Sequence, residues 1–226
     1  MKNNRFCFIT CVNDEETYQE CLYYINHLEL PDGYEIETLA IRGARSIAEG
    51  YNRAIIQSDA KYKIYLHQDV FLVNRQLLSN LLAIFQADER VGMLGLVGTE
   101  ELPPDGIWWN GVRNYGRVYD TSRGKIGLIA FDNPVDGGWK SVQAIDGIFM
   151  ATQYDLPFRS DLFDGWHFYD VSQSLEFIRK GYRIAVPTVS EPWCIHDCGV
   201  TPVGNAYRQD CRIFLKEYTG DVRQFR

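Results

Sequence analysis

The polar cluster His67-Gln68-Asp69 ends an apolar run that begins at Tyr62. A buried strand that stops at such residues presents them at the edge of an open α/β sheet, where ligands bind beyond the carboxyl ends of the strands. Asp69 suits a hard divalent cation such as Mg²⁺ or Mn²⁺, which prefers oxygen ligands. An aspartate at this place can equally cap the following helix near Asn74. Taken alone, Asp69 supports both interpretations.

A second candidate ligand is His196, which follows the last expected strand. A neutral imidazole is a good ligand for Mn²⁺ or Zn²⁺. Two other interpretations remain open. His196 can be a loop histidine with ordinary hydrogen-bond partners, or it can form a zinc site with Cys194 and Cys198, although alternate positions are not a common zinc spacing.

Asp170 is a candidate general base at the start of an expected helix. A carboxylate there caps free N–H groups and interacts well with the helix dipole, which is a sufficient structural reason for it. The functional alternative is that Asp170 takes a proton from an incoming hydroxyl group. The neighbouring Trp166 and His167 would then shape an acceptor pocket.

Alternating strands and helices must position these residues. The first five elements read strand, helix, strand, helix, strand, which predicts a parallel sheet with right-handed crossovers. They cover residues 5–12, 15–28, 35–41, 46–57 and 62–67. The later expected elements are a helix at 75–85, a strand at 91–97, a strand at 142–152, a helix at 169–180, strands at 183–186 and 193–196, and a helix at 205–218.

Residues 98–140 interrupt this pattern. The segment contains many glycines, Pro103-Pro104, and the pair Trp108-Trp109, with only short strand-like pieces. We expect a long loop region with an irregular β-hairpin, and long loops in compact domains are commonly functional. The two tryptophans can stack on an acceptor sugar, close as a lid, or pin the loop through a local hydrophobic cluster.

Composition narrows the function classes. The chain has 226 residues, which fits one domain, and 46% of them are hydrophobic, as in ordinary globular proteins. A net charge of −7 argues against a nucleic-acid-binding protein. No stretch approaches the roughly 18 apolar residues of a transmembrane helix. The six cysteines do not form a disulfide-dense pattern, so we expect a cytoplasmic protein with reduced thiols. The motifs of dinucleotide-binding, P-loop and G-x-S-x-G proteins are absent.

Five short motifs in order resemble the family 2-like glycosyltransferases of the GT-A fold, in particular their StrF-type branch. They are Gly50-Tyr51-Asn52, Ile64–Val70, Asp146-Gly147, Trp166–Asp170 and His196. The resemblance extends over nearly the whole chain. It implies one GT-A-type domain over 1–226, with a mixed, mostly parallel sheet flanked by helices. Residues 1–97 would form the nucleotide-donor half and residues 98–226 the acceptor and catalytic half.

The resemblance implies transfer of a sugar from a UDP- or GDP-sugar to a saccharide or other hydroxyl acceptor, with inversion and with Mn²⁺ or Mg²⁺ as cofactor. His67-Gln68-Asp69 stands where the family has its DxD motif, with His67 in place of the first aspartate. Asp69 and His196 would hold the metal, and Asp170 would be the base. An acidic protein needs such a cation to hold a diphosphate.

The remaining donor contacts that we expect are Asn13, Asn52, Arg45, His67, Gln68 and Asp146. Additional phosphate contacts from Arg53, Arg123 and Lys125 are weaker candidates, because a surface cation is ordinarily just solvated. Two alternatives remain open. The protein can bind a nucleotide sugar without turnover, or it can be a metal-dependent hydrolase that uses the same carboxylates.

Overall fold

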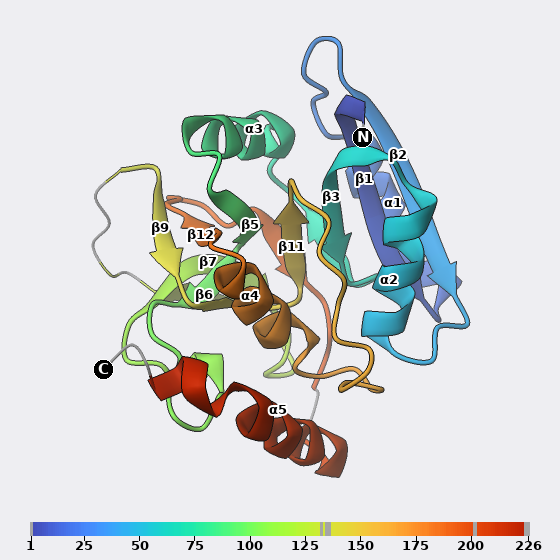
Figure 1. Ribbon diagram of the computed structural model, residues 1–226. Coiled ribbons are helices and arrows are strands. Elements are labelled where there is room, and N and C mark those ends of the chain that lie inside the picture. The colour runs from blue at the N-terminus through green and yellow to red at the C-terminus, as the bar shows by residue number, and fades with distance from the viewer. Residues whose placement is uncertain (1, 132, 134–136, 201–202, 224–226) are drawn as a thin grey trace.

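The computed structural model describes residues 2–131, 133, 137–200 and 203–223. Its centre is a seven-stranded sheet in the order β2-β1-β3-β11-β5-β12-β9 (Figure 1). Five of these strands run in one direction and β11 and β9 run against them, so the sheet is mixed but mostly parallel, as expected. The bounds are β1 (Lys2–Val12), β2 (Glu35–Arg42), β3 (Ala60–Leu66), β5 (Val91–Gly95), β9 (Trp139–Val142), β11 (Phe149–Thr152) and β12 (Arg183–Pro187).

A second sheet has the strand order β10-β6-β7-β13-β4, with β8 beside β7. Its strands are short: β4 (Val70–Leu72), β6 (Val97–Thr99), β7 (Asn114–Asp120), β8 (Gly127–Phe131), β10 (Ala144–Ile145) and β13 (Cys194–His196). β4 follows β3 almost at once and pairs with β13, and β13 pairs with β7. This sheet therefore brings residues near 69, 120 and 196 together, although they are distant in sequence.

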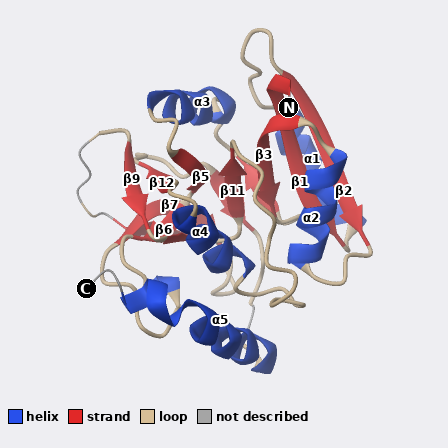
Figure 2. Cartoon of the chain, viewed as in Figure 1, coloured by secondary structure: helices blue, strands red, loops and turns tan. Residues whose placement is uncertain are grey.

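Helices cover both faces of the central sheet (Figure 2). They are α1 (Glu15–Asn26), α2 (Ile47–Gln57), α3 (Leu77–Ala87), α4 (Tyr169–Arg179) and α5 (Asn205–Arg223), with a 3₁₀ turn η1 (Trp108–Asn110). Side chains alternate across a strand. Phe6 and Phe8 of β1 therefore pack in one core with α1 and α3, while Cys7 and Ile9 pack in a second core with α2 and α4.

Residues 98–140 hold the expected irregular hairpin, formed by β7 and β8, among loops and the short elements β6, η1 and the start of β9. Two other sequence-based predictions of elements were wrong in detail. The expected strand at 91–97 divides between the two sheets after Gly95. The expected strand at 142–152 is interrupted after Ile145, where the Asp146 carboxylate accepts a hydrogen bond from the Ile148 N–H at 2.9 Å. Short strands that change sheets have no sequence periodicity long enough to reveal them.

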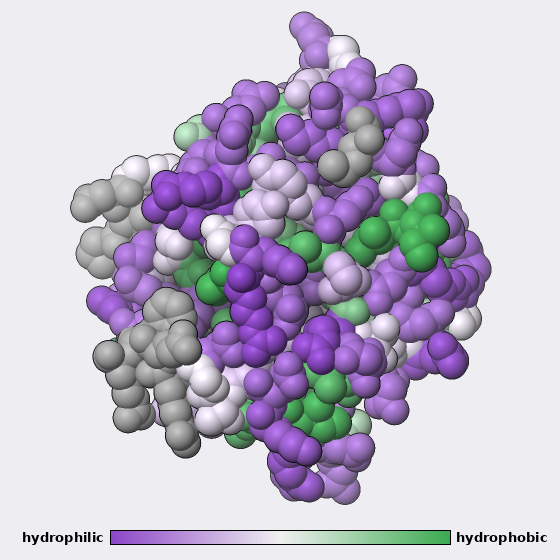
Figure 3. Space-filling view, viewed as in Figure 1, coloured by the Kyte–Doolittle hydropathy of each residue, from purple (hydrophilic) through white to green (hydrophobic). Residues whose placement is uncertain are grey.

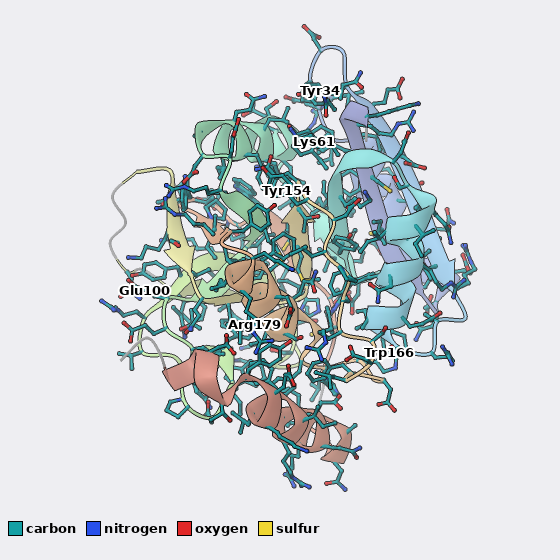
Figure 4. All side chains as sticks on the ribbon, viewed as in Figure 1. Tyr34, Lys61, Glu100, Tyr154, Trp166 and Arg179 are labelled. Atoms are coloured by element: carbon teal, nitrogen blue, oxygen red, sulfur yellow. The ribbon has the colours of Figure 1, made fainter. Side chains whose placement is uncertain are left out.

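Helix α5 is held against α4 by an ion-pair network around Arg179, which Figure 4 labels between the two helices. Arg179 contacts Glu176 of its own helix at 2.9 Å and Asp221 of α5 at 2.7 Å. Arg159 adds a contact to Glu217 at 3.1 Å. Several partly buried charges joined in one network stabilise more than isolated surface pairs do. The network fixes the position of α5, whose first turns reach the candidate site.

On the face shown in Figure 3, the described hydrophobic residues form separate clusters among hydrophilic ones. None of the helices in the described part of the chain is both long enough and apolar enough to cross a membrane. All six cysteines are free thiols, as expected.

Candidate functional site

A pocket opens at the carboxyl ends of the parallel strands β1, β2 and β3. This is the edge at which open α/β sheets bind ligands. Its walls come from the ends of these strands, the start of α2 and one tryptophan of the 153–168 loop. The lining residues are Cys11, Val12, Asn13, Ile41, Gly43, Ala44, Ile47, Tyr51, Leu66, His67, Gln68, Asp69 and Trp166.

Gln68 ties the end of β3 to the loop between β1 and α1. Its Oε1 accepts hydrogen bonds from the backbone N–H groups of Asn13 and Asp14, at 2.9 and 3.1 Å. Its Nε2 donates to the Asn13 Oδ1 at 2.6 Å. Asp14 in turn caps α1 by accepting from the Thr17 N–H. The predicted pair Asn13 and Gln68 thus lies on the pocket wall as one hydrogen-bonded unit.

The Gly50-Tyr51-Asn52 motif has a packing role in each position. A Cβ at Gly50 would lie 2.5 Å from the Cys11 Sγ, so a glycine lets α2 approach β1. Tyr51 is buried and lines the pocket. Asn52, predicted to contact the donor, lies outside the pocket lining. Its amide bonds both the N–H and the C=O of Phe158, which anchors the 153–168 loop. Arg45, also predicted to contact the donor, is exposed and is not among the lining residues, although Ala44 before it is.

Three potential metal ligands converge beside this pocket: His67, Asp69 and His196. The Asp69 Oδ1 lies 3.7 Å from the His196 Nε2 and 3.9 Å from the His67 Nδ1. This oxygen is buried and has no hydrogen-bond partner. A buried carboxylate oxygen without a partner is costly, and a divalent cation would satisfy it. The residues present therefore fit a metal ion. Asp69 and His196 are brought together as predicted, and His67 joins them.

Asp120, at the end of β7, orients His196. Its Oδ2 lies 2.9 Å from the His196 Nδ1, which leaves Nε2 toward Asp69. Burial lowers the pKa of His196, but the hydrogen bonds to Asp120 and Cys198 and the charge of Asp69 together outweigh burial and raise that pKa to about 10. The hydrogen bond with His196 lowers the pKa of Asp120 to about 2. A carboxylate behind a ligand histidine fixes the ring and raises its basicity.

The alternative zinc set Cys194, His196 and Cys198 does not form. Cys194 is fully buried and belongs to neither group of potential ligands among the described residues. The second group is Asp120, His196 and Cys198. The Cys198 Sγ lies 3.9 Å from the Asp120 Oδ2. Because β13 pairs with β7, Asp120 rather than Cys194 is grouped with His196 and Cys198.

A second pocket shares His67 and Trp166 with the first and contains Asp146 and Asp170. Aromatic side chains from η1, the 153–168 loop and α5 form much of its wall. The aromatic and histidine residues of the lining are His67, Trp108, Trp109, Trp166, His167, Phe168, Tyr169, His196 and Tyr207. None of its described lining residues is a lysine or arginine.

Asp146 and Asp170 meet at the break in the strand region. The Asp170 Oδ2 accepts a hydrogen bond from the Gly147 N–H at 2.9 Å. The Asp146 Oδ2 accepts one from the Trp108 Nε1 at 3.1 Å. Burial, together with the charge of Asp146, raises the pKa of Asp170 to about 7. A carboxyl group with such a pKa can take up and release a proton near neutral pH.

The backbone is strained directly before Asp170. Phe168 has φ 59°, the only positive φ of a non-glycine residue in the described chain. Such a conformation costs about 1–3 kcal/mol and persists only where packing enforces it. The ring of Phe168 is buried against Tyr207 and Phe214 of α5, with centroids 4.9 and 5.3 Å away. Helix α5 therefore helps to hold the turn that presents Asp170.

Sequence reasoning missed three residues of the site: Asp120, Tyr169 and Tyr207. The Tyr169 hydroxyl lies 2.5 Å from the His67 Nε2. Asp120 and Tyr207 lie in segments without a recognisable motif, and only strand pairing and helix docking bring them in. Tyr169 belonged to a motif that had been singled out, but its side chain direction depends on the strained turn at Phe168.

The sequence and the fold both resemble those of known proteins. A family model described as "Glycosyltransferase like family" matches residues 7–218. No curated protein matches the sequence. Among solved structures, a mannosyltransferase from Pyrobaculum calidifontis in complex with GDP-Man and Mn²⁺ has a TM-score of 0.58 at 15% identity, over 99% of this chain and 65% of that one.

TarS of S. aureus is a second structural neighbour. One crystal structure of TarS has a TM-score of 0.51 at 11% identity, over 95% of this chain and 40% of that one. Its complex with UDP-GlcNAc has a TM-score of 0.50 at 10% identity, over 88% and 60%. This chain therefore spans less than two thirds of the length of these neighbours, and at such identities the likeness concerns the fold.

Proposed function

The chain belongs to the glycosyltransferase-like family and has the expected GT-A fold, and from this premise we propose that it transfers a sugar from a nucleotide-diphosphate donor to an acceptor hydroxyl. One observation carries the proposal. The buried Asp69 Oδ1, without a hydrogen-bond partner, faces a histidine nitrogen at the edge of the sheet, and Asp170 lies in the adjoining pocket. The proposed donor pocket and the proposed base, Asp170, thus lie on the two sides of His67 and Trp166, the residues that the two pockets share.

The pocket at β1–β3 would hold the nucleotide. Asn13 and Gln68 offer amide groups to its base or ribose, and Arg45 is placed beside the pocket to meet a phosphate. Residues before 97 would supply most donor contacts, with Trp166 contributed by the later half. A GDP- or UDP-sugar is the expected donor, in line with the ligands of the structural neighbours.

Asp69 and His196 would hold a divalent cation, Mn²⁺ or Mg²⁺. When bound, this cation neutralises the charge of the diphosphate and of the leaving nucleotide. Asp69 and His196 therefore set where the diphosphate lies, at the junction of the two pockets. Asp146 would contact the sugar from the wall of the second pocket, where Trp108 holds its carboxylate in place.

Asp170 would act as the general base. Its raised pKa, about 7, lets it accept the proton of the acceptor hydroxyl while that oxygen bonds to the anomeric carbon. The bond from the anomeric carbon to the diphosphate oxygen breaks, and its electron pair leaves with the nucleotide. Attack from the side opposite the leaving group inverts the anomeric centre.

The test is a pair of measurements on the same protein. Calorimetry with UDP and GDP, with and without Mn²⁺, measures donor-site binding. A panel of nucleotide sugars and saccharide acceptors then measures transfer. Failure of every nucleotide diphosphate to bind would refute the proposal. Binding of a nucleotide diphosphate without transfer of sugar to any acceptor would support the alternative, a nucleotide-sugar-binding protein. This alternative is motivated by His67, which stands in place of the first aspartate of the DxD motif. Free sugar released independently of any acceptor would indicate a hydrolase.

A further inference from the structure

We infer that His67 is a third protein ligand of the metal, so that the site has two histidines and one carboxylate and prefers first-row transition-metal cations, Mn²⁺, Co²⁺ and Zn²⁺, over Mg²⁺. This inference rests on the proposed metal dependence and goes beyond it, because it assigns His67 to the metal rather than to the nucleotide. It also predicts which cation the protein selects.

The ring of His67 is oriented for this role. Its Nε2 lies 2.5 Å from the Tyr169 hydroxyl, and its Nδ1 is the nitrogen that faces Asp69, at 3.9 Å from Oδ1. With a cation on Nδ1, the proton of the ring stands on Nε2, where it donates to the Tyr169 oxygen.

His196 repeats this arrangement from the other side. Its outer nitrogen, Nδ1, is bonded to Asp120, and its inner nitrogen, Nε2, lies 3.7 Å from the Asp69 Oδ1. Both imidazoles therefore have an oxygen partner on the nitrogen that faces away from Asp69. Ligand histidines typically carry such a partner on their second nitrogen, which fixes the tautomer and the ring orientation.

The spacing of the three proposed ligand atoms, which are the Asp69 Oδ1, the His67 Nδ1 and the His196 Nε2, also fits one cation. Nitrogen and oxygen ligands at about 2.1 Å from a shared ion lie about 3.0–3.5 Å apart in octahedral or tetrahedral geometry. The observed separations from the Asp69 Oδ1, 3.7 and 3.9 Å, need only a small closure. All three ligand atoms lie within 4.8 Å of one another.

Gly147 makes the arrangement possible. A Cβ at this position would lie 2.1 Å from the Tyr169 hydroxyl oxygen. Any side chain at residue 147 would therefore push Tyr169 away from His67. The glycine of the Asp146-Gly147 motif thus affects the orientation of His67, the proposed metal ligand. The glycine leaves room for the hydroxyl that orients His67.

The donor set determines the selectivity. Imidazole suits transition-metal cations such as Zn²⁺, and the affinity of a site with nitrogen and oxygen ligands is higher for Co²⁺ and Zn²⁺ than for Mn²⁺, whereas Mg²⁺ prefers carboxylates and water. An aspartate in place of His67 would give two carboxylates and one histidine, a harder set. The exchange of aspartate for histidine at the first position of the motif is therefore expected to shift the preference away from Mg²⁺.

The experiment measures metal binding without substrate. Mn²⁺ is titrated into the metal-free protein and followed by electron paramagnetic resonance, and Mg²⁺ is then added as a competitor. Pulsed measurements on the Mn²⁺ complex detect directly bonded imidazole nitrogens. We expect two inequivalent ¹⁴N couplings and an affinity for Mn²⁺ at least tenfold above that for Mg²⁺.

His67→Asp is the main variant and His27→Asp is its matched control, because His27 is a histidine at the exposed end of α1. We expect H67D to lose one ¹⁴N coupling and to reduce the Mn²⁺ to Mg²⁺ affinity ratio at least tenfold, and H27D to change neither. Tyr169→Phe, which removes only the orienting hydroxyl, is expected to weaken Mn²⁺ binding about tenfold while keeping both couplings. Circular dichroism confirms that each variant is folded, and His67→Gln serves as the second variant if H67D does not fold.

A single ¹⁴N coupling in the wild-type protein, or an unchanged affinity ratio in a folded His67 variant, would overturn the inference. Either result leaves the proposed function standing if nucleotide diphosphates still bind in the presence of metal. Absence of any Mn²⁺ binding would also overturn the inference, and the calorimetry with UDP and GDP would then show separately whether the proposed function stands.

Discussion

Replacing Asp170 with asparagine is predicted to abolish most of the activity and yet to stabilise the fold. Asparagine has nearly the same shape and its oxygen can still accept the hydrogen bond from the Gly147 N–H. It has no charge to desolvate and cannot take a proton. Loss of a general base lowers the rate about 10²–10⁴-fold. The gain in stability comes from removing a buried negative charge beside Asp146.

The magnitude follows from the pKa of Asp170, which burial and the charge of Asp146 raise to about 7 from an ordinary value of 3.8. Between these values the folded protein holds a proton that the unfolded chain has lost, so wild-type stability falls as pH rises from about 4 to 7. At about 1.4 kcal/mol per unit, this loss reaches about 4 kcal/mol at pH 8 and roughly a third of that at pH 5. The Asp170→Asn protein does not lose this stability at either pH, because asparagine does not titrate.

The assay is denaturant unfolding of metal-free wild-type and D170N protein at pH 5 and pH 8. We expect the stability advantage of D170N to grow by about 3 kcal/mol between these two conditions. Asp32→Asn, in an exposed turn, is the control and should show no comparable growth. Added Mn²⁺ should reduce the advantage, because a nearby cation favours the ionised carboxylate. An advantage that is absent, or that does not change with pH, would refute the reasoning about Asp170.

Four further outcomes test other parts of the site. For the wild-type enzyme, kcat/KM toward the acceptor should rise with pH and level off above about 7, since the deprotonated form of Asp170 is the active base; a plateau already at pH 5 would contradict this. Gln68→Ala removes three hydrogen bonds to the β1–α1 loop and should weaken nucleotide binding about tenfold by calorimetry, while metal binding stays unchanged. Trp166→Ala should raise KM for both donor and acceptor, because Trp166 lines both pockets, and Trp166→Phe should restore part of each; an effect on one substrate only would exclude a shared wall. Gly147→Ala should weaken Mn²⁺ binding as strongly as Tyr169→Phe does, because its Cβ would occupy the space of the tyrosine hydroxyl; unchanged binding would show that the loop moves aside at no cost.

Local chemistry made much of the architecture predictable. The alternation of strands and helices over the first 66 residues and the mostly parallel sheet were readable, because periodicity and turns are local signals. The order of short motifs around Asp69, Asp170 and His196 was enough to suggest a family, which the match over residues 7–218 confirms.

Only the tertiary structure decided how these residues meet. Pairing of β13 with both β4 and β7 brings Asp120 behind His196 and places His196 opposite Asp69. These contacts join residues 76 to 127 positions apart through strands of three to seven residues, which are too short to carry a clear periodic signal. The orientation of His67 depends on Tyr169, and that of Tyr169 on the left-handed turn at Phe168 and on the space left by Gly147. Sequence chemistry therefore determined which groups were available, whereas long-range packing determined which atoms face the Asp69 carboxylate.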